Sequence, residues 1–119
     1  MNIEDFVTYC LAKPNVEECF PFGPENLVFK VFGKIFTIVD LEGIPLKANL
    51  KCDPDYAVQL RDEYEDVQPG YHMNKKHWNT VTLEGHLENR LIKSLIDHSY
   101  ELVVKSLPAK QKNDLERLK

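Results

Sequence analysis

One stretch of the chain brings cationic, aromatic and amide side chains together within nine residues. Lysine and histidine side chains contact phosphate groups, and aromatic rings stack on unpaired bases. The stretch begins at Tyr71 and is typical of a nucleic-acid contact. Its candidate residues are His72, Lys75, Lys76, His77 and Trp78.

A second set of polar residues comes from strand alternation. Between Pro45 and Cys52 the apolar residues alternate with Lys47, Asn49 and Lys51, the period of a strand that is buried on one face. Lys30 alternates in the same way between Phe29 and Val31. If helices cover only one side of the sheet, these residues form an open basic and aromatic surface together with Lys76 and Trp78 from a later strand. The alternative is that the lysines protect the sheet from aggregation and the tryptophan packs near the core.

The titratable residues give little support for a metal or a catalytic site. The four histidines lack the spacing that places two ligands on one face, and His98 falls in a helical pattern that favours a hydrogen-bonded position near the core. A group of acids is expected to be a solvated surface, with a site for a hard cation as the alternative. This group comprises Asp62, Glu63, Glu65 and Asp66.

No motif of an established enzyme class occurs in the chain. It has no GxSxG elbow, Walker loop or Rossmann fingerprint, and no cysteine lies beside a histidine. We therefore expect no catalytic activity, no metal and no cofactor. The phenylalanines are expected in core and hairpin packing rather than around a cofactor, and they are Phe20, Phe22, Phe29, Phe32 and Phe36.

Composition indicates an ordinary globular domain. The 119 residues are 43% hydrophobic and 29% charged, and the formal net charge is -4, so any contact with a polyanion must be local.

Three cysteines without a CxxC pair favour a reducing compartment. The start MNIEDF is acidic where a signal peptide would be basic, and no apolar run is long enough to span a bilayer. We expect a single domain over residues 1–119, cytoplasmic, without membrane contact, as a monomer or weak dimer.

The elements that must position the candidate residues follow from hydrophobic periodicity. Helices are predicted over Ile3–Leu11, after Asp53-Pro54, and over Leu87–Leu107. Strands are predicted for VEECFPF, LVFKVF, KIFTIVD, Pro45–Cys52, part of Glu65–Tyr71 and Trp78–Leu83. The tail, residues 108–119, is either a short helix or a frayed end. The order α-β-β-β(-β)-α-β-β-α predicts an α+β two-layer sandwich, in which helices pack on one face of an antiparallel sheet.

Four segments in register resemble the MmcQ/YjbR family and together cover nearly the whole chain. They are FPFGPENLVFKVFGKIFTIV, LKCDPDYAVQLRDEY, YHMNKKHWNTVTL and SYELVVKSL. The resemblance implies a two-layer fold related to the secretion-chaperone-like and CyaY-like (frataxin-like) groups. It also implies the DNA-binding description that such proteins often carry.

Two functions are therefore expected as alternatives. The first is DNA or other nucleic-acid binding through the open sheet face. The second is a protein-interaction or chaperone-like role without catalysis, in which the same face or the long helix contacts a protein partner, for example an acidic one. The salt dependence of the binding affinity distinguishes the two functions. Added salt weakens nucleic-acid binding steeply through counterion release, whereas binding through apolar contacts tolerates salt.

Overall fold

The computed structural model describes residues 1–118 as one open antiparallel sheet of six strands with four helices. The strand order across the sheet is β1-β2-β3-β4-β6-β5. The elements in chain order are α1 (Ile3–Leu11), β1 (Val16–Cys19), β2 (Asn26–Val31), β3 (Lys34–Asp40), β4 (Lys47–Lys51), α2 (Pro54–Glu63), β5 (Val67–Pro69), β6 (Trp78–Thr82), α3 (Asn89–Lys105) and α4 (Ala109–Leu118). The predicted α+β class and element order are confirmed, and the tail forms a helix.

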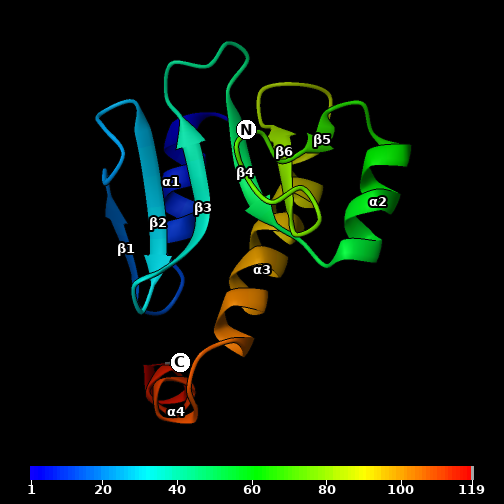
Figure 1. Ribbon diagram of the computed structural model, residues 1–119. Coiled ribbons are helices and arrows are strands. Elements are labelled where there is room, and N and C mark those ends of the chain that lie inside the picture. The colour runs from blue at the N-terminus through cyan, green and yellow to red at the C-terminus, as the bar shows by residue number, and fades with distance from the viewer. Residues whose placement is uncertain (119) are drawn as a thin grey trace.

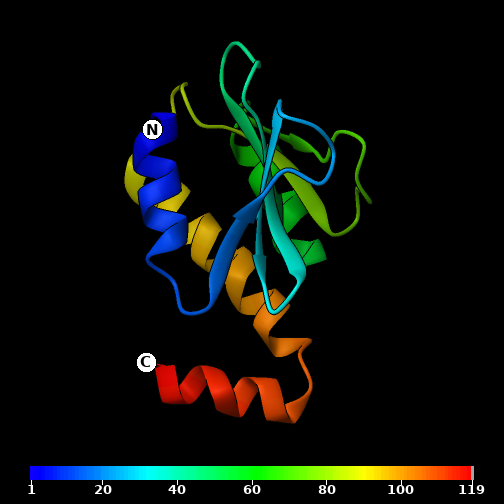
Figure 2. The ribbon, with the colours of Figure 1, turned by 90° about the vertical axis from the view of Figure 1, so that its left-hand side faces the viewer.

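The helices are distributed unevenly about the sheet. Figure 1 looks onto the strands with α1 and α3 behind them, and α2 lies beyond the β5 edge. The view turned by 90° shows α1 and α3 together on one side of the strands and loops on the other, with α2 behind the strands and α4 below the sheet (Figure 2). Within residues 1–118, one face of the sheet therefore has no helix over it. We call this the open face.

Local sequence explains where the helices begin. The Asn2 side chain accepts a hydrogen bond from the Asp5 amide at the start of α1. The Asp53 carboxylate accepts one from the Tyr56 amide, with Pro54 in the first helical position of α2. Both arrangements satisfy an amide that has no partner within the helix. The predicted cap before α2 is confirmed.

The core lies between the sheet and the two covering helices. Phe29 of β2 contacts the ring of Phe6 from α1 at 6.1 Å between centroids, and Phe36 of β3 contacts Tyr100 from α3 at 5.4 Å. Both are edge-on arrangements, which aromatic rings prefer. Phe32 lies in the β2–β3 turn with a φ of 47° and packs against the core.

Two of the five phenylalanines contradict the expected core packing. The predicted strand VEECFPF ends early, because β1 stops at Cys19. Pro21 and Pro24 follow, and proline has no amide to continue a strand ladder. Phe20 and Phe22 consequently lie in the β1–β2 loop, where they are 50% and 58% exposed.

A local irregularity in β3 creates the best-buried polar contact of the core. Phe29 pairs with Thr37 while Lys30 pairs with Ile35, so Phe36 has no partner in β2. The fully buried Ser99 of α3 fills the gap. Its hydroxyl donates to the Phe36 carbonyl at 2.6 Å and accepts from the Lys51 amide at 2.8 Å. One side chain thus links α3 to β3 and β4.

Candidate nucleic-acid interface

Strand register arranges the residues of the open face in rows across the sheet. A middle row crosses all six strands. Its members, from β1 to β5, are Cys19, Val28, Ile38, Asn49, Thr80 and Gln68. The neighbouring rows, one above and one below in Figure 1, carry the candidate lysines.

The lower row, the Trp78 row, contains two of these lysines. Lys51 of β4 lies directly opposite Trp78 of β6. Lys30 of β2 lies at the same level as Lys51. Phe29 pairs with Thr37 of β3, and Thr37 pairs with Leu50 of β4. Lys30 and Lys51 are the next residues along their two strands. Strands are spaced by about 4.8 Å, so Lys30 and Lys51 are about 10 Å apart. All three side chains are half-buried, and Glu17 faces Lys30 from β1.

The third lysine of the alternation pattern lies elsewhere. Lys47 is four residues from Lys51, about 13 Å along the strand. It faces Asp40 on one side and Thr82 on the other, in a surface hollow that is also lined by Glu65, Asp66 and Glu84. Alternation predicted the correct face for Lys47, but the structure does not bring it to Trp78.

The loop from Gly70 to His77 lies over part of the open face. The Tyr71 amide donates to Thr80 Oγ1 at 2.9 Å, and that hydroxyl donates to Asn49 Oδ1 at 2.6 Å. Asn49 Nδ2 in turn donates to the Tyr71 carbonyl at 3.4 Å. Asn49 therefore holds the loop in place. Tyr71 itself remains 68% exposed.

The other loop residues differ in their availability. His72 is exposed, with its ring 4.0 Å from that of Tyr71. Lys75 turns back and donates to the Gly70 carbonyl at 3.2 Å. Lys76 is exposed but lies in the loop, not in the strand where it was expected, because β6 begins at Trp78. His77 contributes its carbonyl, which accepts from the Cys52 amide at 2.8 Å.

Arg61 of α2 positions this loop, and the sequence did not single it out. Its Nε donates to Asn79 Oδ1 at 2.7 Å, and its Nη2 donates to the carbonyls of Trp78, at 3.3 Å, and Lys75. Asn79 is buried and also donates to the Ala57 carbonyl at 3.5 Å. The available signal was Asn79 itself, an amide on the inward side of a strand that must find a partner.

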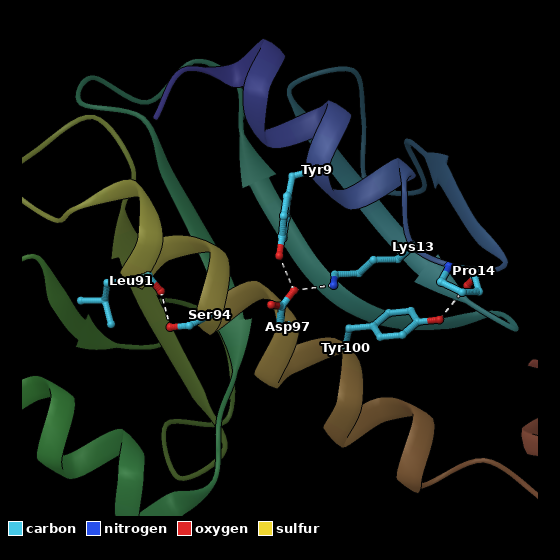
Figure 3. Close-up of polar contacts among 7 residues, drawn as sticks. All are labelled: Tyr9, Lys13, Pro14, Leu91, Ser94, Asp97 and Tyr100. Carbon is cyan, nitrogen blue, oxygen red and sulfur yellow. Dashed lines mark hydrogen bonds and ion pairs between the residues drawn. The ribbon is translucent and has the colours of Figure 1, made fainter. Parts of the chain in front are cut away.

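A second polar cluster joins α1 to α3 on the opposite side of the sheet (Figure 3). Tyr9 donates to Asp97 Oδ1 at 2.7 Å, and the Lys13 ammonium forms an ion pair with the same oxygen. Tyr100 donates to the Pro14 carbonyl at 2.7 Å. Burial, followed by the hydrogen bond to Asp97, raises the pKa of Tyr9 to about 12. The phenol therefore stays protonated, and the cluster serves to fasten the helices.

The thiols of Cys10 and Cys52 are equally unreactive near neutral pH. Burial raises the pKa of Cys10 to about 12 and that of Cys52 to about 11, and only the thiolate is a good nucleophile. Within residues 1–118, no group of three or more His, Cys, Asp or Glu side chains could hold a metal ion. Among the acids that the sequence grouped together, Asp66 accepts the His86 amide at 2.6 Å. No helix in the described part of the chain has the length and apolar character needed to cross a membrane.

His98 occupies the hydrogen-bonded position that its helical pattern predicted. Its Nε2 accepts from the Asp53 amide at 3.0 Å, and its ring meets that of Tyr56 edge-on at 5.3 Å. Burial lowers the pKa of His98, although the carboxylates of Asp53 and Glu101 act in the opposite direction. Protonation would also place a second donor against the Asp53 amide.

The lowered pKa of His98 predicts a loss of stability in mild acid. The unfolded chain binds the proton more readily, so the stability that His98 contributes is complete above about pH 6.5 and declines as pH falls through the lowered value. Urea unfolding at about pH 7.5 and about pH 5.5 measures this loss. We expect His98→Gln to show a smaller difference between the two pH values than the wild type. His86→Gln, which changes an exposed histidine, should keep the wild-type difference, and equal losses in all three proteins would contradict the assignment.

Known proteins resemble this chain over most of its length. The family model described as YjbR matches residues 11–102. The uncharacterised protein YbdF of Escherichia coli O157:H7 is 44% identical over 110 residues, 92% of this chain and 87% of YbdF. The uncharacterised protein YjbR of Escherichia coli strain K12 is 36% identical over 119 residues, 99% of this chain and 100% of YjbR.

Solved structures agree with these sequence matches. The crystal structure of Deinococcus radiodurans protein DR2400, a DUF419 domain, has a TM-score of 0.90 at 37% identity and covers 97% of this chain and 88% of its own. A crystal structure of a Pseudomonas syringae protein has a TM-score of 0.75 at 30% identity and covers 86% of this chain and 98% of its own. Matching sequence, length and fold lead to one conclusion: the chain belongs to the YjbR family.

Proposed function

We propose that the protein binds single-stranded nucleic acid, without catalysis, through the Trp78 row and the loop beside it. The observation that carries the proposal is the β4–β6 register, which places Lys51 opposite Trp78. Lys30 lies at the same level of a face that no helix within residues 1–118 covers. This combination of ammonium groups and aromatic surface suits a strand whose bases are unpaired.

Each part of the surface has a distinct task in this proposal. Lys30, Lys51 and Lys76 contact successive phosphates, and a base stacks on the exposed Tyr71 and His72 rings. A single strand is favoured over a duplex because these rings need an unstacked base. The net charge of -4 keeps binding weak and local. Binding without catalysis is consistent with the raised pKa values of Tyr9, Cys10 and Cys52.

The proposal predicts a salt-dependent interaction that the single tryptophan of the chain reports directly. Titration with oligothymidine should quench Trp78 fluorescence at low salt. Three phosphate contacts to a single strand give a slope of about -2 for log Kobs against log salt. Replacing Lys30, Lys51 and Lys76 together by alanine should weaken binding about tenfold and flatten the slope.

A matched variant separates local contacts from total charge. Lys105, Lys110 and Lys112 lie on or after the long helix, and their replacement by alanine changes the net charge equally. This control should bind about as well as the wild type, and Tyr71→Ala should weaken binding by about 1–3 kcal/mol. No quenching by oligothymidine, or equal weakening by both lysine triples, would remove the proposal.

We assign the alternative role, interaction with another protein, to a different part of the molecule from the sheet face and the long helix where it was first expected. The Trp78 row is cationic and half-buried, whereas the most exposed apolar residue, Ile44, is in the β3–β4 loop at the other end of the sheet and is 98% exposed. The two roles can therefore be tested independently.

A further inference from the structure

Two neighbouring loops at one end of the sheet expose large apolar side chains. The β1–β2 loop carries Phe20 and Phe22, and the β3–β4 loop carries Leu41 and Ile44. The loops lie side by side, since the Leu41 amide donates to the Glu25 carbonyl at 2.8 Å. Both stand at the end opposite to the Trp78 row (Figure 1). We call these four residues the loop surface.

Hydrogen bonds within each loop order the backbone that carries the loop surface. Within the β1–β2 loop the Gly23 amide donates to the Phe20 carbonyl and the Asn26 amide to the Gly23 carbonyl. In the β3–β4 loop the Asp40 carboxylate accepts the Glu42 amide at 3.0 Å. These bonds hold the exposed side chains on ordered turns, which lowers the entropy that a partner must remove on binding.

The charges around these apolar residues have one sign. The two loop segments, residues 20–25 and 40–46, contain Glu25, Asp40 and Glu42 and no lysine or arginine. Lys47, which faces Asp40 from β4, is the nearest basic residue in the strand pairing. Apolar side chains within an acidic rim are complementary to an apolar segment that carries basic residues. The same rim repels nucleic acid and anionic lipid surfaces.

We propose that the loop surface binds a basic amphipathic segment of a partner protein. Apolar side chains of that segment pack on Phe20, Phe22 and Ile44, and its lysine or arginine residues lie beside Glu25 and Glu42. The proposal does not depend on nucleic-acid binding, because the two surfaces lie at opposite ends of the sheet. The protein then binds two ligands of opposite charge at opposite ends of the sheet: its basic row contacts phosphates, and its acidic rim contacts a basic peptide segment.

A designed peptide tests the proposal without knowledge of the natural partner. The probe is a labelled helical peptide of about 15 residues with leucines on one face and lysines on the other. Its titration by fluorescence anisotropy should show binding, and the shifts of backbone amide signals in NMR spectra should concentrate in residues 20–25 and 40–46. Replacing Phe22 and Ile44 together by serine should weaken binding about tenfold, and Glu25→Lys with Glu42→Lys should weaken it several-fold.

Controls distinguish this surface from general charge attraction and from self-association. Val58→Ser, which removes an apolar residue of α2 that is 53% exposed, should bind the peptide normally. A peptide with glutamates in place of the lysines should not bind. The proposal is overturned if the probe fails to bind, or binds all variants equally. It is also overturned if sedimentation shows a dimer of the wild-type chain that Phe22→Ser abolishes, because a second copy would then occupy the surface.

Discussion

Ser99→Ala is expected to lower the free energy of unfolding by about 2–4 kcal/mol. The hydroxyl is fully buried and serves the Phe36 carbonyl and the Lys51 amide at once. Its removal leaves one donor and one acceptor without partners, and each such group costs about 1–3 kcal/mol. Urea unfolding followed by circular dichroism measures the loss.

Ser94→Ala supplies the matched control on the same helix. Ser94 is exposed, and its hydroxyl donates only to the Leu91 carbonyl one turn earlier (Figure 3). Alanine is the better helix former at such a position, so stability should stay within about 0.5 kcal/mol of the wild type. A loss below about 1 kcal/mol for Ser99→Ala would mean that β3 and β4 close the gap without the hydroxyl.

Most of the fold could be predicted because its signals are local. The apolar spacing in Ile3–Leu11 and the Asp53-Pro54 cap each determined one helix from adjacent residues alone. Alternation from Pro45 to Cys52 likewise placed Lys47, Asn49 and Lys51 on one face, as the pairing of β4 with β6 requires. Such patterns depend on the period of a single element, and no knowledge of its neighbours is needed.

The arrangement of the site could not be predicted because it depends on register and on side-chain partners. Alternation predicts that Lys47 and Lys51 lie on the same face of the sheet. Only the pairing of β4 with β6 shows that Lys51 lies opposite Trp78, whereas Lys47 lies opposite Thr82. Composition likewise grouped Phe20 and Phe22 with the core, although the two prolines of that loop end the strand before them. Both errors concern where a strand lies or stops relative to its neighbours.

The loop beside Trp78 owes its position to contacts on both faces of the sheet. On the open face, Asn49 and Thr80 hold the backbone of Tyr71. From the other side, Arg61 reaches the carbonyls of Lys75 and Trp78. The candidate interface is therefore coupled to the packing of α2, and a change in α2 should alter the interface without touching any residue exposed on it.

Arg61→Ala is accordingly expected to destabilise the protein by about 2–4 kcal/mol and to loosen residues 70–78. The substitution leaves the buried Asn79 Oδ1 without its charged donor, a loss of about 1.5–3 kcal/mol, and the more exposed carbonyl of Lys75 adds little because water can replace the guanidinium there. Hydrogen exchange should accelerate at the amides of Met73 and His77, which close the turns of the loop. Arg61→Lys keeps the positive charge, but an ammonium group lacks the planar fork with which the guanidinium reaches several acceptors at once. This variant should therefore recover little of the lost stability.

Arg90→Ala is the control for loss of a positive charge, because Arg90 is exposed and lies 3.7 Å from Glu88 in a solvent-exposed pair. Such pairs contribute about 0–1 kcal/mol, so this variant should unfold nearly as the wild type does. If Arg61→Ala matched Arg90→Ala in stability and in loop exchange, α2 would not position the loop. The interface would then be held by Asn49 and Thr80 alone, and α2 variants would leave the Trp78 fluorescence titration unchanged.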